Sequence, residues 1–244
     1  MEELKISFSG KRLERLAKLK KYLSHKAELP ILGRSFKDED LWIEIVTQFC
    51  VMGGTRMIES LMNDSSKYSE FKNEIGLGKL LSFKKSKRIG HIANVLKTFK
   101  ATRFHPQEAE KINALFSNSK VIRDRRIVLL DGLSYKQPFN KIRDELIRRN
   151  PYFKFKSASD FMIKVGLSRD VIALDTRILG VLNDHFGQKL KPNKVQGNKK
   201  VYELIEEALR KACKKIRIPL ARLDRILFKY SEKRAIAFIL EDLK

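Results

Sequence analysis

The sequence predicts an all-α fold with about ten helices, because apolar residues recur at helical spacing through most of the chain. No alternation of apolar and polar residues long enough for a regular strand appears in the 244 residues. Twelve glycines and six prolines are few for a turn-rich β fold. Because 43% of the residues are hydrophobic, the chain can bury a core and is expected to be globular.

The first third of the chain contains two predicted helical stretches. Residues 11–24 place leucines at helical spacing, which is typical of an amphipathic helix, and Pro30 lies in the loop that follows. Residues 39–62 are apolar nearly all round, so we expect a central, buried helix or pair of helices there. The pair Gly53-Gly54 either ends a helix or makes room for a close approach of the backbone.

The middle of the chain continues the helical pattern. Residues 75–103 are basic and helical by period, and His105-Pro106 interrupts the pattern before a helix expected over about 106–117. Residues 120–135 are also helical by period. Residues 138–149 begin with a proline, which suits the first turn of a helix.

A tight hairpin between two helices is predicted next. Asn150-Pro151 ends one helix, and residues 157–165 form another that stops at Gly166 as its C-cap. The hairpin therefore spans Pro151 to Lys156.

The remainder of the chain is predicted to be helical around one loop. A helix is expected over 175–183, and residues 189–200 form a polar, basic loop. Two further helices are expected over 201–215 and 219–243.

The charge balance points to a polyanionic partner. The chain has 52 Lys and Arg against 29 Asp and Glu, a net charge of +23, and an excess of this size favours nucleic acid through counterion release. Basic residues are spread along the chain rather than gathered in a tail, so the positive surface belongs to the folded body. The alternative, a thermophile-like surface rich in Lys and Glu, explains the number of charges but not their imbalance.

No metal or other cofactor is expected. Cys50 and Cys213 are the only cysteines; one disulfide is possible, but thiols in apolar helical stretches more often pack as small hydrophobic groups. Two cysteines are too few for an iron–sulfur cluster. The four histidines lack the spacing of metal ligands.

The sequence also predicts a location. It has no run of about 18 apolar residues, and the N-terminal stretch is charged and lacks a secretory core. We therefore expect a cytoplasmic, nucleoid-associated protein with no targeting signal and no membrane partner.

One stretch resembles a known superfamily. The order helix, hairpin, lysine, helix, followed by V-I-A-L-D-T-R-I-L at residues 171–179, resembles the helix–hairpin–helix DNA glycosylases. The most similar group is the archaeal-type 8-oxoguanine DNA glycosylases that also cleave abasic sites. In that group a lysine opens the helix after the hairpin, and an aspartate precedes the following helix. Lys156 and Asp175 occupy these two positions.

Three further segments carry weaker resemblance to the same family. Residues 80–92 resemble a segment in which an aromatic and several basic residues precede a helix. Residues 41–49 resemble the buried central helix, and residues 221–230 resemble the last core helix.

The chain also departs from the family's pattern. The family's hairpin carries two glycines that let bare N–H groups approach a DNA phosphate, whereas residues 151–156 contain none. Residues 52–55 read Met-Gly-Gly-Thr where many relatives have Gln-Gln-Thr, and the chain runs beyond Ala235 to a terminal Lys244. These departures leave the identity of the damaged base open.

The resemblance implies a two-lobed helical fold of the helix–hairpin–helix glycosylase type, with the active site in the cleft between the lobes. Residues 36–146 would form the central lobe. Residues 1–35 and 147–244 would form the second lobe, which contains the helix–hairpin–helix at about 141–165.

The chemistry suits Lys156 and Asp175. A carboxylate near the anomeric carbon stabilises the positive charge that develops on the sugar as the glycosidic bond breaks. A neutral lysine amine can displace the base and form a Schiff base. Desolvation, a helix N-terminus and neighbouring cations each favour a neutral amine, and Lys156 is expected to have all three. The alternatives without catalysis are that Lys156 is a surface lysine at a helix start and that Asp175 is only the N-cap of the next helix. Capping is compatible with catalysis.

The remaining site residues are predicted from the same resemblance. A flipped base needs aromatic walls, although each of these rings also fits the core. The candidate base-pocket residues are Trp42, Phe49, Phe161, Phe228 and Tyr230. The candidate DNA-binding residues are Arg56, Lys84, Lys85, Lys87, Arg88, Phe153 and Lys154.

The predicted function is that of a bifunctional DNA glycosylase and abasic-site lyase of base excision repair, which excises a damaged base, with 8-oxoguanine as the first expectation. Its expected partner is double-stranded DNA with a damaged base or abasic site, and the protein is expected to be a monomer. The alternatives are the same chemistry on another lesion such as a modified adenine, a non-catalytic helix–hairpin–helix DNA-binding protein, and an RNA-binding protein, since charge alone does not separate the two nucleic acids.

Overall fold

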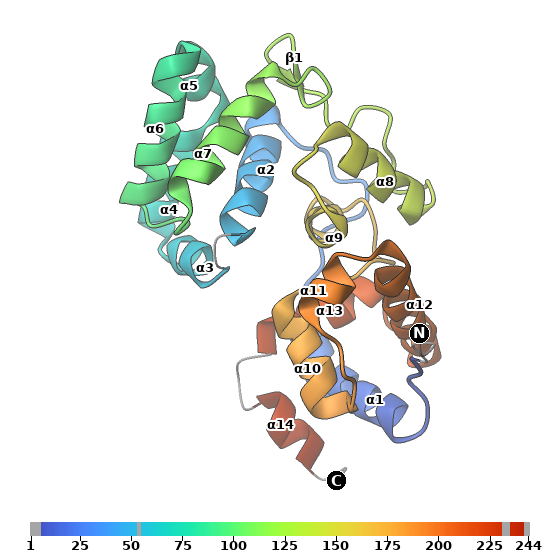
Figure 1. The fold of residues 1–244 in the computed structure, drawn as a ribbon. Helices are drawn as coiled ribbons and strands as arrows, with labels where there is room; N and C mark the ends of the chain where they lie inside the picture. The colour runs from blue at the N-terminus through green and yellow to red at the C-terminus, as the bar shows by residue number, and fades with distance from the viewer. Residues whose placement is uncertain (1–5, 53–54, 231–234, 242–244) are drawn as a thin grey trace. The chain divides into compact units, whose positions relative to one another are not determined.

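The computed structural model describes residues 6–52, 55–230 and 235–241 and confirms the all-α fold (Figure 1). Across these ranges the only strands are β1 (Ile122–Arg123) and β2 (Arg126–Ile127), which pair antiparallel. All other regular structure in the described ranges is helical. The Gly53-Gly54 pair and Lys244 lie outside the described residues.

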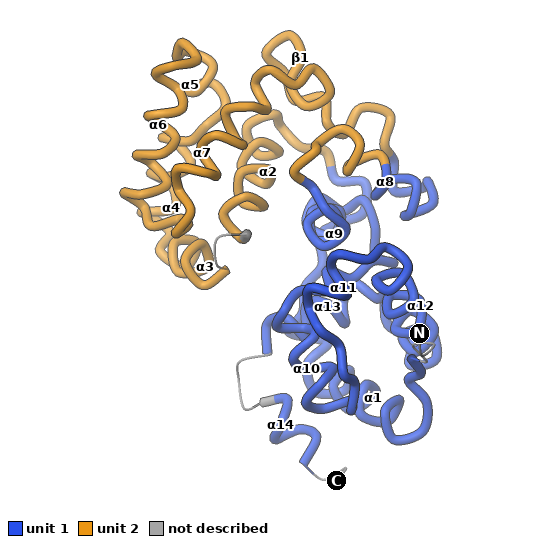
Figure 2. The backbone as a smooth tube through the Cα atoms, in the orientation of Figure 1, with its two compact units in different colours: residues 1–34, 134–144, 153–244 blue, residues 35–133, 145–152 orange. Residues whose placement is uncertain are grey.

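The chain divides into two compact units, which Figure 2 colours separately. Unit 1 comprises residues 1–34, 134–144 and 153–244, and unit 2 comprises residues 35–133 and 145–152. These units differ from the two expected lobes chiefly at 134–144, which belong to unit 1, and at 147–152, which belong to unit 2. The boundary divides α8 (Phe139–Arg149) between the units.

Unit 2 is built around α2, which contacts helices on several sides. Its fully buried Trp42 donates its indole N–H to the Ile75 carbonyl at 2.8 Å and packs edge-on against Phe116. The elements of unit 2 besides its share of α8 are β1, β2, α2 (Asp38–Met52), α3 (Thr55–Asn63), α4 (Ser65–Ile75), α5 (Leu77–Ser82), α6 (Lys85–Thr98), α7 (His105–Ala114) and the 3-10 turn at Leu115–Ser117.

Unit 1 has its own apolar core, to which α1, α10, α12 and α13 contribute buried side chains such as Leu16, Leu179, Leu209 and Leu223. The elements of unit 1 besides its share of α8 are α1 (Lys11–Leu23), the 3-10 turn at Ser24–Lys26, α9 (Phe155–Lys164), α10 (Thr176–Phe186), α11 (Pro192–Gln196), α12 (Lys199–Lys215), α13 (Leu220–Tyr230) and α14 (Ala235–Leu240).

The helix predicted over residues 120–135 is wrong, because this segment forms the β-hairpin and the turns after it. Asp124 and Arg125 both adopt positive φ, at 50° and 63°, which reverses the chain between the strands. Each strand is only two residues long, too short for alternation to show in a sequence. Ile122 and Ile127 are partners in the ladder, and both are buried.

Several predicted helix boundaries also change. The stretch 39–62 contains α2 and α3, and residues 75–103 contain α5 and α6, which are separated where Phe83 turns extended at the C-cap of α5. Helix α4 was not predicted. The expected loop at 189–200 holds α11, which Pro192 opens. The predicted helix 219–243 corresponds to α13 and α14 on either side of residues that the structure does not describe.

Two smaller expectations concern cysteines and membranes. Cys50 and Cys213 are both buried and free, as expected for small apolar side chains. Within the described ranges, none of the helices has the length and apolarity needed to cross a bilayer.

Gly166 ends α9 in a conformation that suits glycine, with φ at +68°. Its carbonyl accepts the Gly33 N–H at 3.0 Å, and a Cβ added at Gly166 would lie 2.2 Å from the Ile31 carbonyl oxygen. We expect Gly166→Ala to lower the free energy of unfolding by about 2 kcal/mol or more, because left-handed backbone strain adds to a clash with backbone.

Chemical denaturation of both proteins measures this change. The matched control is Gly180→Ala in the middle of α10, where an added Cβ meets nothing within 4 Å. That substitution is expected to raise stability by about 0.5–1 kcal/mol. Equal stabilities for wild type and Gly166→Ala would show that the contact with Ile31 is not a constraint.

Candidate active site

The predicted hairpin joins α8 to α9 without any left-handed residue. Residues 150–154 all avoid positive φ, so the turn itself does not require glycine. Instead, the fully buried Asn150 closes it, since its side-chain oxygen accepts the Tyr152 N–H at 3.2 Å. This hairpin therefore forms without a glycine.

The start of α9 is fixed by a serine. Ser157 Oγ accepts the Lys154 N–H at 2.8 Å and also contacts the Lys154 carbonyl at 3.2 Å, while the Ala158 N–H closes the first helical turn onto that carbonyl. Lys156 is the second residue of this helix and is half-buried. Its position in the first turn of α9 confirms the helix start that the sequence predicted there.

Asp175 is the N-cap of α10, as predicted. Its Oδ1 accepts the Ile178 N–H at 2.8 Å, and the residue is only 7% exposed. Burial raises the pKa of the Asp175 carboxyl, opposed by the Ile178 hydrogen bond and by the positive charges of Lys156 and Arg177. Lys156 and Asp175 both belong to unit 1, and the positive charge of Lys156 acts on the Asp175 carboxyl.

The candidate aromatic residues differ in accessibility. In unit 1, Phe161 is fully buried, Tyr230 is nearly so, and the half-buried Phe228 lies under the Arg177 guanidinium at 4.9 Å. In unit 2, Trp42 and Phe49 are fully buried. Phe228 is therefore the candidate with the most accessible ring, and a role for any of the five in binding a base stays a prediction.

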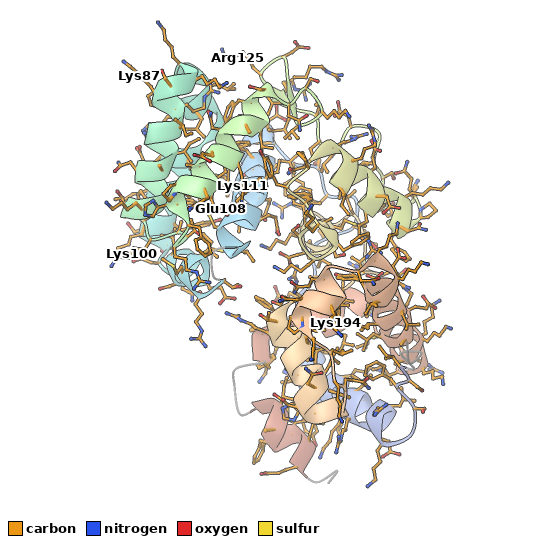
Figure 3. The ribbon with its side chains drawn as sticks, in the orientation of Figure 1. Lys87, Lys100, Glu108, Lys111, Arg125 and Lys194 are labelled. Atoms are coloured by element: carbon orange, nitrogen blue, oxygen red, sulfur yellow. The ribbon has the colours of Figure 1, made fainter. Side chains whose placement is uncertain are left out.

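Most of the candidate DNA-binding side chains are exposed. These are Arg56, Lys84, Lys85, Lys87 and Lys154, of which Lys87, on the first turn of α6, is labelled in Figure 3. Arg88 differs, because it donates to the carbonyls of Leu80 and Phe83 at 2.8 Å and stacks 4.0 Å from the Phe116 centroid. These contacts tie the Arg88 side chain into unit 2, and burial lowers its pKa; its role in binding DNA stays a prediction.

Phe153, the remaining candidate of the hairpin, is 1% exposed and packs on Phe161 with ring centroids 5.2 Å apart. Its ring anchors the hairpin onto α9. A role for Phe153 in binding DNA stays a prediction.

The prediction from sequence missed a group of buried polar residues around Asp175. Asp160 on α9 pairs with Arg225 at 2.9 Å, and Arg225 also lies 3.4 Å from Asp224. Asp224 is 1% exposed and accepts the Ala173 N–H at 2.7 Å. The signal that could have found Asp224 is a carboxylate on the apolar face of the helix L-A-R-L-D-R-I-L-F.

Asp224 makes stability depend on pH. Burial raises its pKa to about 7, with smaller raising effects from Asp160 and Asp175 and a lowering effect from Arg225. Since the folded state holds this proton more tightly, the contribution of Asp224 to stability is complete below the usual Asp range and is lost as pH rises through about 7. A shift of that size corresponds to at most roughly 4 kcal/mol.

We therefore expect the stability difference between wild type and Asp224→Asn to change steadily from pH 4 to pH 8, with the wild type losing stability relative to the variant. Denaturant unfolding of both proteins across this range measures it. Parallel curves for the two proteins would contradict a raised pKa at this position.

A hairpin between two helices, a lysine at the start of the second helix and a buried carboxylate capping the next define the helix–hairpin–helix class of DNA glycosylase folds. The sequence model of the family described as 8-oxoguanine DNA glycosylase matches residues 31–218. The chain therefore belongs to the 8-oxoguanine DNA glycosylase family of DNA repair, which confirms the resemblance found in the sequence.

A solved structure supports the same fold. The chain is similar to the 8-oxoguanine glycosylase/lyase of Methanocaldococcus jannaschii, crystallised in complex with a 15mer DNA containing 8-oxoguanine. The TM-score is 0.58 at 19% sequence identity, over 90% of this chain and 89% of that chain. No curated protein sequence matches this chain.

Proposed function

We propose that this DNA glycosylase excises 8-oxoguanine from double-stranded DNA and then cleaves the abasic site through a Schiff base on Lys156. The observation that carries the proposal is the presence, within unit 1, of a half-buried lysine at the start of α9 and the buried, capped carboxylate of Asp175, on which the charge of that lysine acts. A glycosylase that only hydrolyses needs the carboxylate but not the lysine. The similar archaeal protein, which is a glycosylase/lyase, supports this reading.

The first step is displacement of the base. After the Lys156 ammonium gives up a proton to solvent, the lone pair of Nζ attacks C1′ of the flipped nucleotide, and the bond from C1′ to the base nitrogen breaks with its electron pair leaving on the base. Positive charge develops on the sugar as that bond stretches. The carboxylate of Asp175, held by Ile178 and poorly solvated, stabilises this charge.

The second step breaks the strand. Loss of an Nζ proton and opening of the sugar ring give a protonated imine between C1′ and Lys156. Removal of a C2′ proton then expels the 3′ phosphate by β-elimination. Borohydride reduces the imine to a stable amine, so the intermediate can be trapped as a covalent protein–DNA adduct.

The DNA partner follows from charge and exposure. The net charge of +23 favours any polyanion, and the exposed cations at Arg56, Lys84, Lys85, Lys87 and Lys154 are suited to phosphates. We propose that the protein acts as a monomer on chromosomal DNA in the cytoplasm.

The test uses the whole protein with duplexes that carry a single 8-oxoguanine, a single modified adenine or no lesion. Release of the free base and strand cleavage are measured, with and without borohydride. The proposal predicts release and trapping on the 8-oxoguanine duplex and no reaction on the undamaged one. Release from only the modified adenine would assign another lesion, and binding without release from any duplex would identify a non-catalytic DNA-binding protein.

A further inference from the structure

The segment that leads to Asp175 is buried but has no regular secondary structure. Residues 171–174 are at most 5% exposed, and they belong neither to a helix nor to a strand. Backbone N–H and C=O groups buried in this way must find partners, because each one left unsatisfied costs free energy. The N–H groups of residues 172–174 all donate to side chains, while the Ala173 carbonyl accepts the Asp175 N–H at 2.6 Å.

Tyr202 on α12 supplies two of these hydrogen bonds. Its hydroxyl donates to the Ile172 carbonyl at 2.6 Å and accepts the Leu174 N–H at 3.1 Å. The residue is fully buried, and burial raises the pKa of its hydroxyl well above the usual range of tyrosine, so the hydroxyl keeps its proton and can donate. One side chain thus fixes the backbone on both sides of Ala173.

Two carboxylates accept the N–H groups of the two residues before Leu174. Glu206 Oε1 on α12 accepts the Ile172 N–H at 3.3 Å, and Asp224 Oδ1 on α13 accepts the Ala173 N–H at 2.7 Å. Three consecutive N–H groups, those of residues 172–174, therefore end on the side chains of Tyr202, Glu206 and Asp224. We call these three residues the polar cradle.

The polar cradle is also tied to α9, the helix that carries Lys156. The Tyr202 hydroxyl lies 3.5 Å from Ser159 Oγ, and Arg143 bridges Ser159 to Glu206 at 3.2 and 2.8 Å. On the other side, Arg225 joins Asp224 to Asp160 of α9. One buried network therefore spans the element that bears the lysine and the segment that bears the carboxylate.

We propose that Tyr202, Glu206 and Asp224 are positioning residues, which hold Asp175 at the place relative to Lys156 that excision requires. The inference rests on the proposed function, in which these two groups act on the same sugar. A carboxylate stabilises a developing charge well only when it is fixed before reaction. Helix capping fixes the Asp175 side chain on α10, and the polar cradle fixes the backbone just before it.

The test measures single-turnover excision of 8-oxoguanine with protein in saturating excess, because this rate constant reports on the folded molecules rather than on their number. Tyr202→Phe removes only the hydroxyl and keeps the ring that packs 5.7 Å from Phe155. We expect the rate constant to fall about 10- to 100-fold, with the affinity for lesion DNA unchanged. The matched control is Tyr22→Phe on α1, where the side chain is exposed, and it should leave both values at wild type.

A pair of variants at Asp224 tests independently whether the polar cradle positions Asp175. This pair keeps the proposal testable even if Tyr202→Phe does not fold. Asp224→Leu removes the acceptor for the Ala173 N–H, whereas Asp224→Asn keeps an oxygen there. The proposal predicts a loss of rate in the leucine variant that asparagine largely restores. A merely structural role would lower the melting temperature without this ordering of rate constants.

Two failures are distinguishable. If the wild type excises the base while Tyr202→Phe and Asp224→Leu react at the wild-type rate, the polar cradle does not position Asp175. If the wild type excises no base at all, the proposed function itself is overturned, and this inference falls with it.

Discussion

Asp175→Asn is expected to lower the rate constant for base excision by about 100- to 1,000-fold while the protein remains at least as stable as the wild type. The loss of rate follows because an amide cannot stabilise positive charge at the sugar. Asparagine keeps an oxygen that can accept the Ile178 N–H, so the cap on α10 survives.

The stability half of this prediction follows from the pKa of Asp175, which burial raises. A carboxyl with a raised pKa stabilises the fold below its usual range, and that contribution is lost as pH rises through the folded-state pKa. The ionised form of this poorly solvated carboxyl therefore opposes folding, and asparagine relieves this cost. Single-turnover excision and thermal unfolding at pH 7 measure the two effects.

The control for this variant is Asp184→Asn on the same helix, where the side chain is exposed and activity should not change. A variant Asp175→Asn that is less stable than the wild type and fully active would contradict both halves of the prediction. Stability lost together with activity would identify Asp175 as a structural cap alone.

Lys156→Ala is expected to abolish the covalent adduct with DNA and to lower base release by about 1,000-fold or more, because the nucleophile of the first step is removed. Lys211→Ala on α12 is the matched control, since its side chain is 73% exposed and pairs only weakly with Glu207, at 3.9 Å. Gel analysis of borohydride-treated reactions and quantification of the released base measure the two activities separately.

Base release and adduct formation can respond differently to Lys156→Ala, and each result has its own meaning. Normal base release without any adduct would show that water attacks C1′ and that Lys156 acts only in strand cleavage. A normal adduct from Lys156→Ala would assign the Schiff base to another amine and contradict the proposed role of Lys156.

The helical fold could be predicted from sequence because its signals are local. The leucines of α1 and the Asn150-Pro151 break each lie within a few residues of the structure that they indicate. The same holds for the order of hairpin, Lys156 and Asp175, which comes from one continuous stretch of chain. Failures occurred where the local signal was short or ambiguous, as in the two-residue strands that were predicted as a helix.

The supporting part of the candidate site could not be predicted in this way. Tyr202, Glu206 and Asp224 act on a segment about 30 to 50 residues earlier in the chain. Tyr202 and Glu206 look like ordinary residues of an amphipathic helix, and the carboxylate of Asp224 on an apolar face indicates a buried partner without identifying it. Arg88 makes contacts that its place among other basic residues did not indicate. Its guanidinium donates to carbonyls of α5 and of the residue after it, and its role in binding DNA stays a prediction.

The most direct test of the central claim is to locate the covalent bond. The wild-type protein is mixed with a duplex that carries one 8-oxoguanine, reduced with borohydride, digested with trypsin and sequenced by mass spectrometry. Because trypsin cleaves after Lys154 but not after a modified lysine, we expect the sugar remnant on Lys156 in a peptide spanning residues 155–164. A remnant on any other amine, or no adduct from a duplex whose base is released, would contradict the assignment of Lys156 as the nucleophile.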